Sequence, residues 1–110
     1  MADYIDPKIE AMCDATRRTI IERLARGALS VGEIASAFPI SRPAVSQHLR
    51  ILKEAGLVAD RPDGNRRLYQ LNRAEFASLR DYFAGFLQAP PGSDADGAAS
   101  PEEDRSWRAW

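Results

Sequence analysis

The side chains whose types and spacing could do chemistry are concentrated between positions 42 and 53. Gln47 can form a bidentate pair with adenine, and Arg42 can pair with guanine or with a phosphate. Ser46 offers a short donor and acceptor for a base edge or a phosphate oxygen. We therefore predict that this stretch contacts double-stranded DNA. Its predicted contact residues are Arg42, Pro43, Ser46, Gln47, Arg50 and Lys53.

A helix over residues 41–56 would position these side chains. Ser41 is a suitable N-cap, and Gly56 is a suitable terminator. The apolar stripe of this helix consists of Val45, Leu49 and Leu52. The polar residues lie opposite or beside the stripe, and the N-terminal turns of a recognition helix usually approach the bases. We assign base-proximal contacts to the first turns and phosphate contacts to Arg50 and Lys53.

A second basic cluster follows in a predicted β-hairpin. Two strand-like runs, residues 57–61 and 66–71, flank the turn sequence Pro-Asp-Gly-Asn at residues 62–65. Arginines beside a tight turn suit a wing that lies along the DNA backbone or enters the minor groove. The predicted wing contacts are Arg61, Asn65, Arg66 and Arg67. The alternatives are an ordinary solvated helix face and a charged turn that serves only solubility.

The distribution of charge supports DNA over these alternatives. The formal net charge of −1 argues by itself against a nucleic-acid binder. Residues 41–73, however, hold seven Lys or Arg and three Asp or Glu, which gives this segment a net charge of +4. A local basic face is what phosphate contact requires, and the average over the chain hides it.

The remaining pattern completes a recognisable architecture. Further helices are predicted at residues 4–13, 14–27, 30–38 and 72–89. Ser30 and Glu33 have the spacing of a capping box. The expected fold is mainly α with a small β-hairpin, a winged helix-turn-helix with five helices in the order ααααββα.

The first and last helices carry more apolar surface than so small a core can bury. We expect part of it to meet a second copy of the chain. The predicted dimer-interface residues are Ile5, Ile9, Met12, Leu79, Phe83, Phe86 and Leu87. A two-fold dimer would place two recognition helices about 34 Å apart, which predicts a palindromic operator.

The chain divides by composition into a domain at residues 1–89 and a flexible acidic tail at residues 90–110. Trp107 and Trp110 in the tail could dock on the domain. The competing function is therefore a winged-helix module for protein–protein contact, in which the aromatic last helix and this tail form the contact surface.

Other functional classes find little support in the pattern. No nucleophile–base pair or carboxylate pair stands at a useful spacing, so we predict no catalytic residues, no metal and no cofactor. His48 suits helix packing or a phosphate hydrogen bond. For Cys13 a buried thiol is favoured, with an oxidation-sensing thiol across a dimer axis as the alternative. Neither a signal peptide nor an apolar run of roughly 20 residues is present, so we expect a cytoplasmic protein.

Two motifs resemble the ArsR-type repressor family. These are Asp-Ala-Thr-Arg-Arg at residues 14–18 and Ser-Arg-Pro-Ala-Val-Ser-Gln-His-Leu-Arg-Ile-Leu-Lys-Glu-Ala-Gly-Leu-Val at residues 41–58, followed by Arg-Arg-Leu-Tyr-Gln-Leu at residues 66–71. The resemblance covers about residues 5–88 and implies a homodimeric winged-helix repressor that dimerises through its first and last helices and releases DNA on a signal. It also implies DNA contacts at Arg42, Pro43, Ser46 and Gln47, and a wing at Arg66 and Arg67.

The chain departs from the metal-sensing members of that family. Those members carry a Cys pair in the helix before the turn, or His and carboxylates on the last helix. Residues 31–38 contain no Cys, and the last helix offers only Glu75 and Asp81. Because soft and borderline metals prefer thiolate or imidazole ligands, the resemblance is to a member that lacks the metal-sensing ligands.

Overall fold

The computed structural model describes residues 2–88, with side chains from Ile5 onward. The predicted tail at residues 90–110 and its two tryptophans lie outside the described residues. The elements in chain order are α1 (Ala2–Ala11), α2 (Ala15–Leu24), β1 (Leu29–Ser30), α3 (Val31–Ala35), α4 (Arg42–Glu54), β2 (Val58–Asp63), β3 (Arg66–Leu71), α5 (Arg73–Ala84) and a 3-10 turn (Gly85–Leu87). The chain divides into two compact units between Arg80 and Asp81, inside α5.

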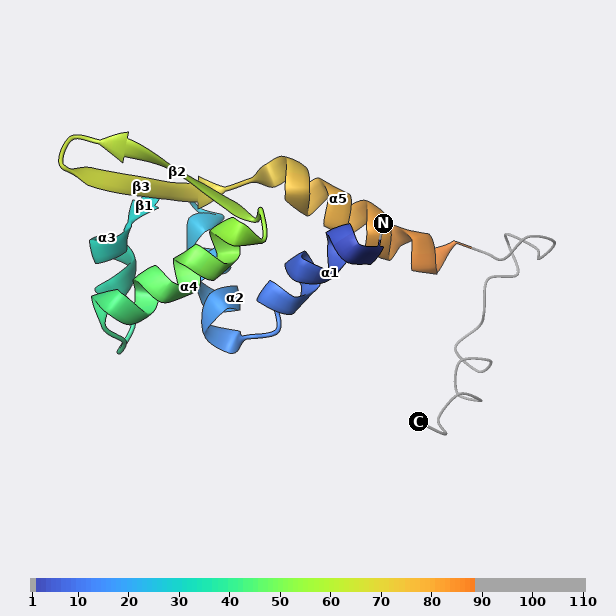
Figure 1. Cartoon of the computed structure of the whole chain (residues 1–110), viewed down its shortest axis with the longest axis horizontal. Helices are drawn as coiled ribbons and strands as arrows, with labels where there is room; N and C mark the ends of the chain where they lie inside the picture. The colour runs from blue at the N-terminus through green and yellow to red at the C-terminus, as the bar shows by residue number, and fades with distance from the viewer. Residues whose placement is uncertain (1, 89–110) are drawn as a thin grey trace. The chain divides into compact units, whose positions relative to one another are not determined.

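The predicted winged helix-turn-helix is confirmed, with one added strand. The described residues form five α-helices and a β2–β3 hairpin, as expected (Figure 1). The sheet has a third strand, because β1 pairs antiparallel with β3 through Leu29 opposite Tyr69 and Ser30 opposite Leu68. The strand order is β1-β3-β2, so β3 is the central strand and ties the wing to the start of α3.

Polar side chains cap the helices of the helix-turn-helix. Ser30 and Glu33 form the expected capping box: the Ser30 N–H donates to Glu33 Oε1 at 2.8 Å, and the Glu33 N–H donates to Ser30 Oγ at 3.2 Å. Ser41 caps α4 by accepting from the Ala44 N–H at 3.3 Å. These caps satisfy backbone donors that a helix leaves unpaired at its start, so they fix where α3 and α4 begin.

The boundaries of α4 and of the wing depend on two glycines with positive φ. Gly56, at φ 86°, lets the chain reverse after α4 and enter β2. Gly64, at φ 65°, takes the first position of the two-residue turn between Asp63 and Arg66, which pair across the hairpin. The turn is therefore tight, and it holds the wing arginines next to the strands.

The core lies between α2, α3, α4 and the hairpin base. Its apolar side chains are contributed at helical spacing by the helices and by the residues that follow α4. The most deeply buried are Ile20, Leu24, Ile34, Val45, Leu49, Leu52 and Leu57. Because the predicted stripe of α4 is fully buried in this core, its opposite face is fixed toward solvent.

The first helix begins and ends two residues earlier than predicted, at Ala2–Ala11 rather than residues 4–13. The N–H groups of Met12 and Cys13 bond three residues back instead of four, which tightens the chain into a turn before the Asp14 cap of α2. As a result Cys13 is exposed. The favoured expectation of a buried thiol was therefore wrong.

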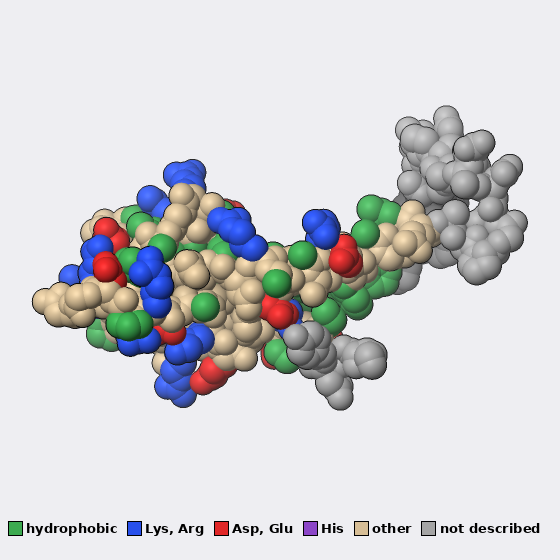
Figure 2. Space-filling view, turned by 90° about the horizontal axis from the view of Figure 1, so that it is seen from above, with side chains coloured by type: hydrophobic (Ala, Val, Ile, Leu, Met, Phe, Trp, Pro, Cys, Tyr) green, Lys and Arg blue, Asp and Glu red, His purple; other side chains and the backbone are tan. Residues whose placement is uncertain are grey.

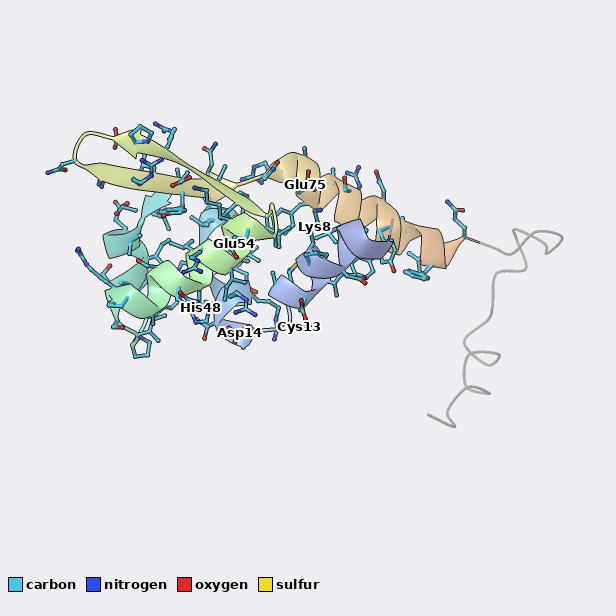
Figure 3. All side chains as sticks on the ribbon, viewed as in Figure 1. Lys8, Cys13, Asp14, His48, Glu54 and Glu75 are labelled. Atoms are coloured by element: carbon cyan, nitrogen blue, oxygen red, sulfur yellow. The ribbon has the colours of Figure 1, made fainter. Side chains whose placement is uncertain are left out.

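Lys8 of α1 is buried, although it carries a charge. Its Nζ lies 3.0 Å from Glu75 Oε1 in the first turn of α5, and its side chain is 4% exposed (Figure 3). A buried ammonium needs such a partner, because an unpaired charge in the interior is strongly unfavourable. This ion pair fastens α1 to the start of α5.

The predicted interface residues of α1 and the first part of α5 belong largely to the core of their own chain. Ile5, Ile9 and Met12 are partly buried against it, and Leu79 is only 5% exposed. Leu79 thus has little surface to offer a partner.

In the second unit, three residues predicted for the interface are exposed: Phe83, Phe86 and Leu87 are 52%, 70% and 88% exposed. Tyr82 joins them as an edge-to-face partner of Phe83 and Phe86, at ring-centroid distances of 5.4 and 5.2 Å. None of the helices in the described part of the chain is long and apolar enough to cross a membrane.

Candidate nucleic-acid interface

The exposed face of α4 presents the residues that were predicted to read bases. Pro43, Ser46 and Gln47 are exposed, while Val45 and Leu49 on the opposite side are fully buried. Among the residues that the structure describes, Ser46 and Gln47 use no side-chain atom in a hydrogen bond. The amide of Gln47 therefore keeps its donors and acceptor for an outside partner.

Arg42 lies over the start of α3. A Cβ on Gly32 would stand 2.6 Å from a terminal guanidinium nitrogen of Arg42, so a side chain at position 32 would displace the far end of this arginine. Arg42 makes no ion pair with a described residue. Its guanidinium lies close to Gly32 of α3 and makes no hydrogen bond with a described residue, so its five N–H donors stay available.

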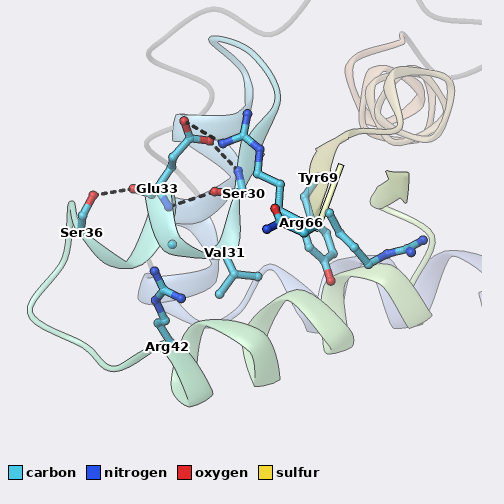
Figure 4. Close-up of a pocket in the computed structure, with 10 residues that line it drawn as sticks. Ser30, Val31, Glu33, Ser36, Arg42, Arg66 and Tyr69 are labelled. Carbon is cyan, nitrogen blue, oxygen red and sulfur yellow. Dashed lines mark hydrogen bonds and ion pairs between the residues drawn. The ribbon is translucent and has the colours of Figure 1, made fainter. Parts of the chain in front are cut away.

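A groove of about 630 Å³ separates α3 and the start of α4 from the wing. Figure 4 shows Arg42 on one side of it and Arg66 on the other, with the Ser30–Glu33 capping box between them. The lining residues are Ser30, Val31, Gly32, Glu33, Ser36, Arg42, Asn65, Arg66, Arg67 and Tyr69. The groove is therefore lined both by Arg42 of the predicted recognition helix and by residues of the predicted wing, which are separate motifs in the sequence.

The wing residues Arg61, Asn65, Arg66 and Arg67 are all exposed. Arg66 is shared between two carboxylates, with Nε 3.3 Å from Asp63 Oδ2 and a terminal nitrogen 3.7 Å from Glu33 Oε2. Figure 2 shows acidic side chains among the basic ones on the surface that carries the hairpin. The local positive charge is thus partly compensated inside the chain.

The two predicted phosphate contacts of α4 are also paired. Arg50 Nε lies 3.3 Å from Glu54 Oε2, one turn further along the helix. Lys53 Nζ lies 2.8 Å from Asp60 Oδ1 of β2. The Arg50–Glu54 pair is more than two-thirds exposed on both sides, so we expect water and salt to screen it strongly.

Asp60 is the functional candidate that sequence reasoning missed. Its second oxygen, Oδ2, accepts from Arg67 Nε at 2.7 Å, so one carboxylate joins Lys53 of α4 to Arg67 of β3. The Asp60 side chain is only 8% exposed. The inward alternation of Val58 and Asp60 along β2 was the available signal, since residues two apart on a strand share a face.

Hydrogen bonds to charged groups lower two carboxyl pKa values at this surface. Those from Lys53 and then Arg67 hold the pKa of Asp60 below its ordinary value of 3.8. The Ser30 backbone N–H does the same for the pKa of Glu33, which is ordinarily 4.5. Both groups are therefore carboxylates at neutral pH.

Comparison with known proteins decides the family. Residues 14–60 match the family described as "Bacterial regulatory protein, arsR family". The transcriptional repressor SdpR of Bacillus subtilis is 36% identical over 78 residues, which cover 71% of this chain and 87% of the repressor. The chain belongs to the arsR family of bacterial regulatory proteins.

Two further similar proteins are also described as transcriptional regulators. An HTH-type transcriptional regulator of Mycobacterium tuberculosis is 61% identical over 71 residues, or 64% of this chain and 66%, just under two thirds, of that regulator. A crystal structure described as a possible transcriptional regulator for arsenical resistance superposes with a TM-score of 0.68 at 39% identity, covering 90% of this chain and 91% of that one.

One solved relative bears directly on assembly. It is the homodimeric winged helix-turn-helix DNA-binding domain of a possible ArsR-family regulator from Mycobacterium bovis, solved in solution. It is 29% identical, with a TM-score of 0.64, and covers 76% of this chain and 80% of that one.

His48 and Cys13 lie apart from the groove of this arsR-family chain. His48 Nδ1, on the flank of α4, is 3.5 Å from a terminal nitrogen of Arg17 and 3.9 Å from Asp14 Oδ2 of the α2 cap (Figure 3). It therefore packs α4 onto α2, which is the packing role considered for it. Cys13 Sγ is 3.4 Å from the Ile9 carbonyl oxygen. Within residues 2–88 no three His, Cys, Asp or Glu side chains are grouped so that they could hold a metal ion.

Proposed function

We propose that this arsR-family chain is a dimeric transcriptional repressor that binds a palindromic DNA operator. In each protomer α4 enters the major groove, and the wing lies on the backbone or in the minor groove. The observation that carries the proposal is the exposed face of α4. Ser46 and Gln47 are exposed about one turn along this helix from Arg42, and Arg42 lines a groove together with Arg66 of the wing. Base-reading side chains next to phosphate-binding cations are what direct readout needs.

The groove between α3 and the wing fits a stretch of sugar–phosphate backbone. It separates the element that would read the major groove from the hairpin that would reach the next minor groove, and a phosphate strand runs between those two grooves in B-DNA. Arg42 and Arg66 would face that strand from opposite sides.

Dimerisation is supported by the exposed aromatic residues of the second unit and by the homodimeric relative from Mycobacterium bovis. Apolar side chains as exposed as Phe86 and Leu87 are usually covered by a partner. A two-fold dimer would present two copies of α4 to successive turns of the duplex. We propose that the repressor acts in the cytoplasm and has no catalytic activity.

The deciding experiment selects genomic fragments that bind the purified chain and measures the affinity for the enriched duplex at several salt concentrations. We expect a palindromic sequence and a log–log slope of several units, because each neutralised phosphate contributes about 0.9. Binding that ignores salt, or is unchanged in the double variant Gln47→Ala/Arg67→Ala, would contradict the proposal. The protein–protein module would instead show no enriched sequence, and the named relatives do not favour it.

A further inference from the structure

Asp60 holds two of the cations that the proposed function assigns to DNA. Its oxygens lie 2.8 Å from Lys53 Nζ and 2.7 Å from Arg67 Nε, and these come from α4 and from β3. The side chain of Asp60 is 8% exposed, whereas those of Lys53 and Arg67 are 54% and 53% exposed. The carboxylate therefore lies beneath the surface, and the two cations reach outward from it.

The hairpin register creates this arrangement. Asp60 stands opposite Tyr69, which makes Arg67 its diagonal neighbour on the same face of the sheet. The last turn of α4 brings Lys53 to the other oxygen. The ion triad thus connects the predicted recognition helix to the predicted wing by a route other than the chain itself.

The triad leaves both cations able to bind DNA. Arg67 uses only Nε, so its terminal nitrogens keep four N–H donors, and the Lys53 ammonium keeps two of its three. Asp60 cancels one of the two positive charges and limits the geometries that the other donors can reach. This restraint costs little for a duplex that fits that geometry, but it penalises binding in other registers.

We infer that Asp60 is a specificity-determining residue, which positions Lys53 and Arg67 for the cognate duplex and weakens binding to all other DNA. The inference rests on the proposed function. Non-specific binding depends mainly on the number of cations free to neutralise phosphates, and Asp60 lowers that number. Specific binding depends on geometry, and Asp60 supplies a fixed one between α4 and the wing.

Two other acidic partners at this surface, Glu54 and Asp63, do not share these properties. Glu54 is 68% exposed and Asp63 is 45% exposed, and each is paired to an arginine within its own helix or turn. Such pairs add little rigidity, because exposed ion pairs are weak and screened. Asp63 thereby provides a matched control of equal charge.

The test compares Asp60→Asn with Asp63→Asn in the full chain. The probes are the duplex that the wild-type chain enriches from genomic fragments and a scrambled duplex of the same length. For Asp60→Asn we expect affinity for the scrambled duplex to rise about threefold to tenfold, with a salt slope steeper by about one unit. Affinity for the enriched duplex should not rise, so the ratio of the two affinities should fall by at least about threefold.

Asp63→Asn adds the same charge without releasing a buried restraint. It should strengthen binding to both duplexes by similar factors and leave their ratio within about twofold of wild type. If Asp60→Asn also leaves the ratio unchanged, or changes it no more than Asp63→Asn does, the inference is overturned. If the wild-type chain enriches no sequence at all, the proposed function fails instead.

Circular dichroism would detect whether Asp60→Asn fails to fold, and in that case a second variant tests the inference. Lys53→Met breaks the triad from the helix side and leaves Asp60 paired with Arg67. We expect it to lower the affinity ratio as well, whereas Arg50→Met, whose partner is exposed, should weaken binding to both duplexes equally. If Lys53→Met and Arg50→Met lower the ratio of enriched-duplex to scrambled-duplex affinity equally, the inference is overturned.

Discussion

Gln47 projects from the exposed face of α4 with its amide unpaired among the described residues, and that makes it the sharpest single test of base readout. Gln47→Ala should weaken binding to the enriched duplex about 5-fold to 150-fold, the equivalent of a lost bidentate contact worth about 1–3 kcal/mol. Binding to a scrambled duplex should stay the same, because the amide carries no charge. Fluorescence anisotropy with both duplexes measures the two effects.

Arg50 supplies the control for that prediction, since it lies on the same helix and its guanidinium is assigned to phosphate. Arg50→Gln should weaken binding to both duplexes and reduce the salt slope by about one unit. A Gln47→Ala variant that behaved like Arg50→Gln would mean that α4 does not read base edges.

Helical spacing was enough to predict which residues of α4 are exposed, but it could not predict the ion-pair partners of its cations. Val45 and Leu49 fix which side of α4 is buried, and Ser46 and Gln47 must then face outward. The pairing of Lys53 with Asp60 depends on where the hairpin folds back onto α4, which is a tertiary relation between residues seven apart in different elements. Periodicity within one element carries no information about it.

At the scale of elements, α3 is only five residues long and depends on its cap. Short helices gain little from propagation, so the Ser30 cap contributes a large share of what defines this one. Ser30→Ala should lower the free energy of unfolding by about 1 kcal/mol, measured by urea denaturation. Ser36→Ala is the control: its hydroxyl donates to the Glu33 carbonyl at the exposed end of α3, so its effect should be less than half as large.

The ion pairs of Asp60, which link α4 to the hairpin, predict that the stability of the fold decreases in acid. The pKa of Asp60 is lower in the folded chain than its ordinary 3.8, so the folded state binds fewer protons than the unfolded state in this range. The stabilisation from Asp60 is therefore complete above about pH 4 to 5 and is lost as the pH falls through the lower, folded value.

Urea denaturation between pH 2 and pH 5 measures this linkage. The free energy of unfolding of Asp60→Asn should fall less steeply with acid below pH 3.8 than that of the wild-type chain. Parallel curves for wild type and Asp60→Asn would show that the triad adds no stability.

The helices and the hairpin were predictable because each carries its own periodic pattern and its own caps or turn residues. The strand β1 was not, since two residues give no period, and Leu29 and Ser30 become a strand only through pairing with Tyr69 and Leu68. The exposure of Cys13 was missed for a related reason. Its position depends on the turn that joins α1 to the Asp14 cap, and a helix continued to residue 13 would have placed the thiol on the apolar face.

At the scale of the whole molecule, the net charge of the chain is −1, and some of its acidic side chains lie next to the cations that are predicted to bind DNA. Four of the predicted DNA-binding cations, Arg50, Lys53, Arg66 and Arg67, contact carboxylates. Arg42 and Arg61 make no ion pair within the described residues. The attraction for DNA then arises from a few uncommitted cations and from paired ones that keep spare donors, which favours release at moderate salt.

The exposed aromatic side chains of the second unit give the last prediction, which concerns assembly. Phe83 is 52% exposed, so Phe83→Asp should leave the fold intact but place a charge on the surface that we propose is covered by a second copy. Sedimentation velocity at micromolar concentration should show a dimer for wild type and a monomer for this variant. Affinity for the palindrome should fall more than tenfold, because two separate monomers would then bind the two half-sites independently.

Ala74→Asp is the matched control, since it adds the same charge at an exposed position in the first turn of α5, where an acidic side chain is tolerated by the helix dipole. It should sediment as the wild type does. A wild-type chain that is monomeric at micromolar concentration would remove the argument for operator symmetry, although α4 and the wing could still bind a single half-site. The oligomeric state therefore decides whether specificity comes from one helix of this small domain or from two helices at a fixed spacing.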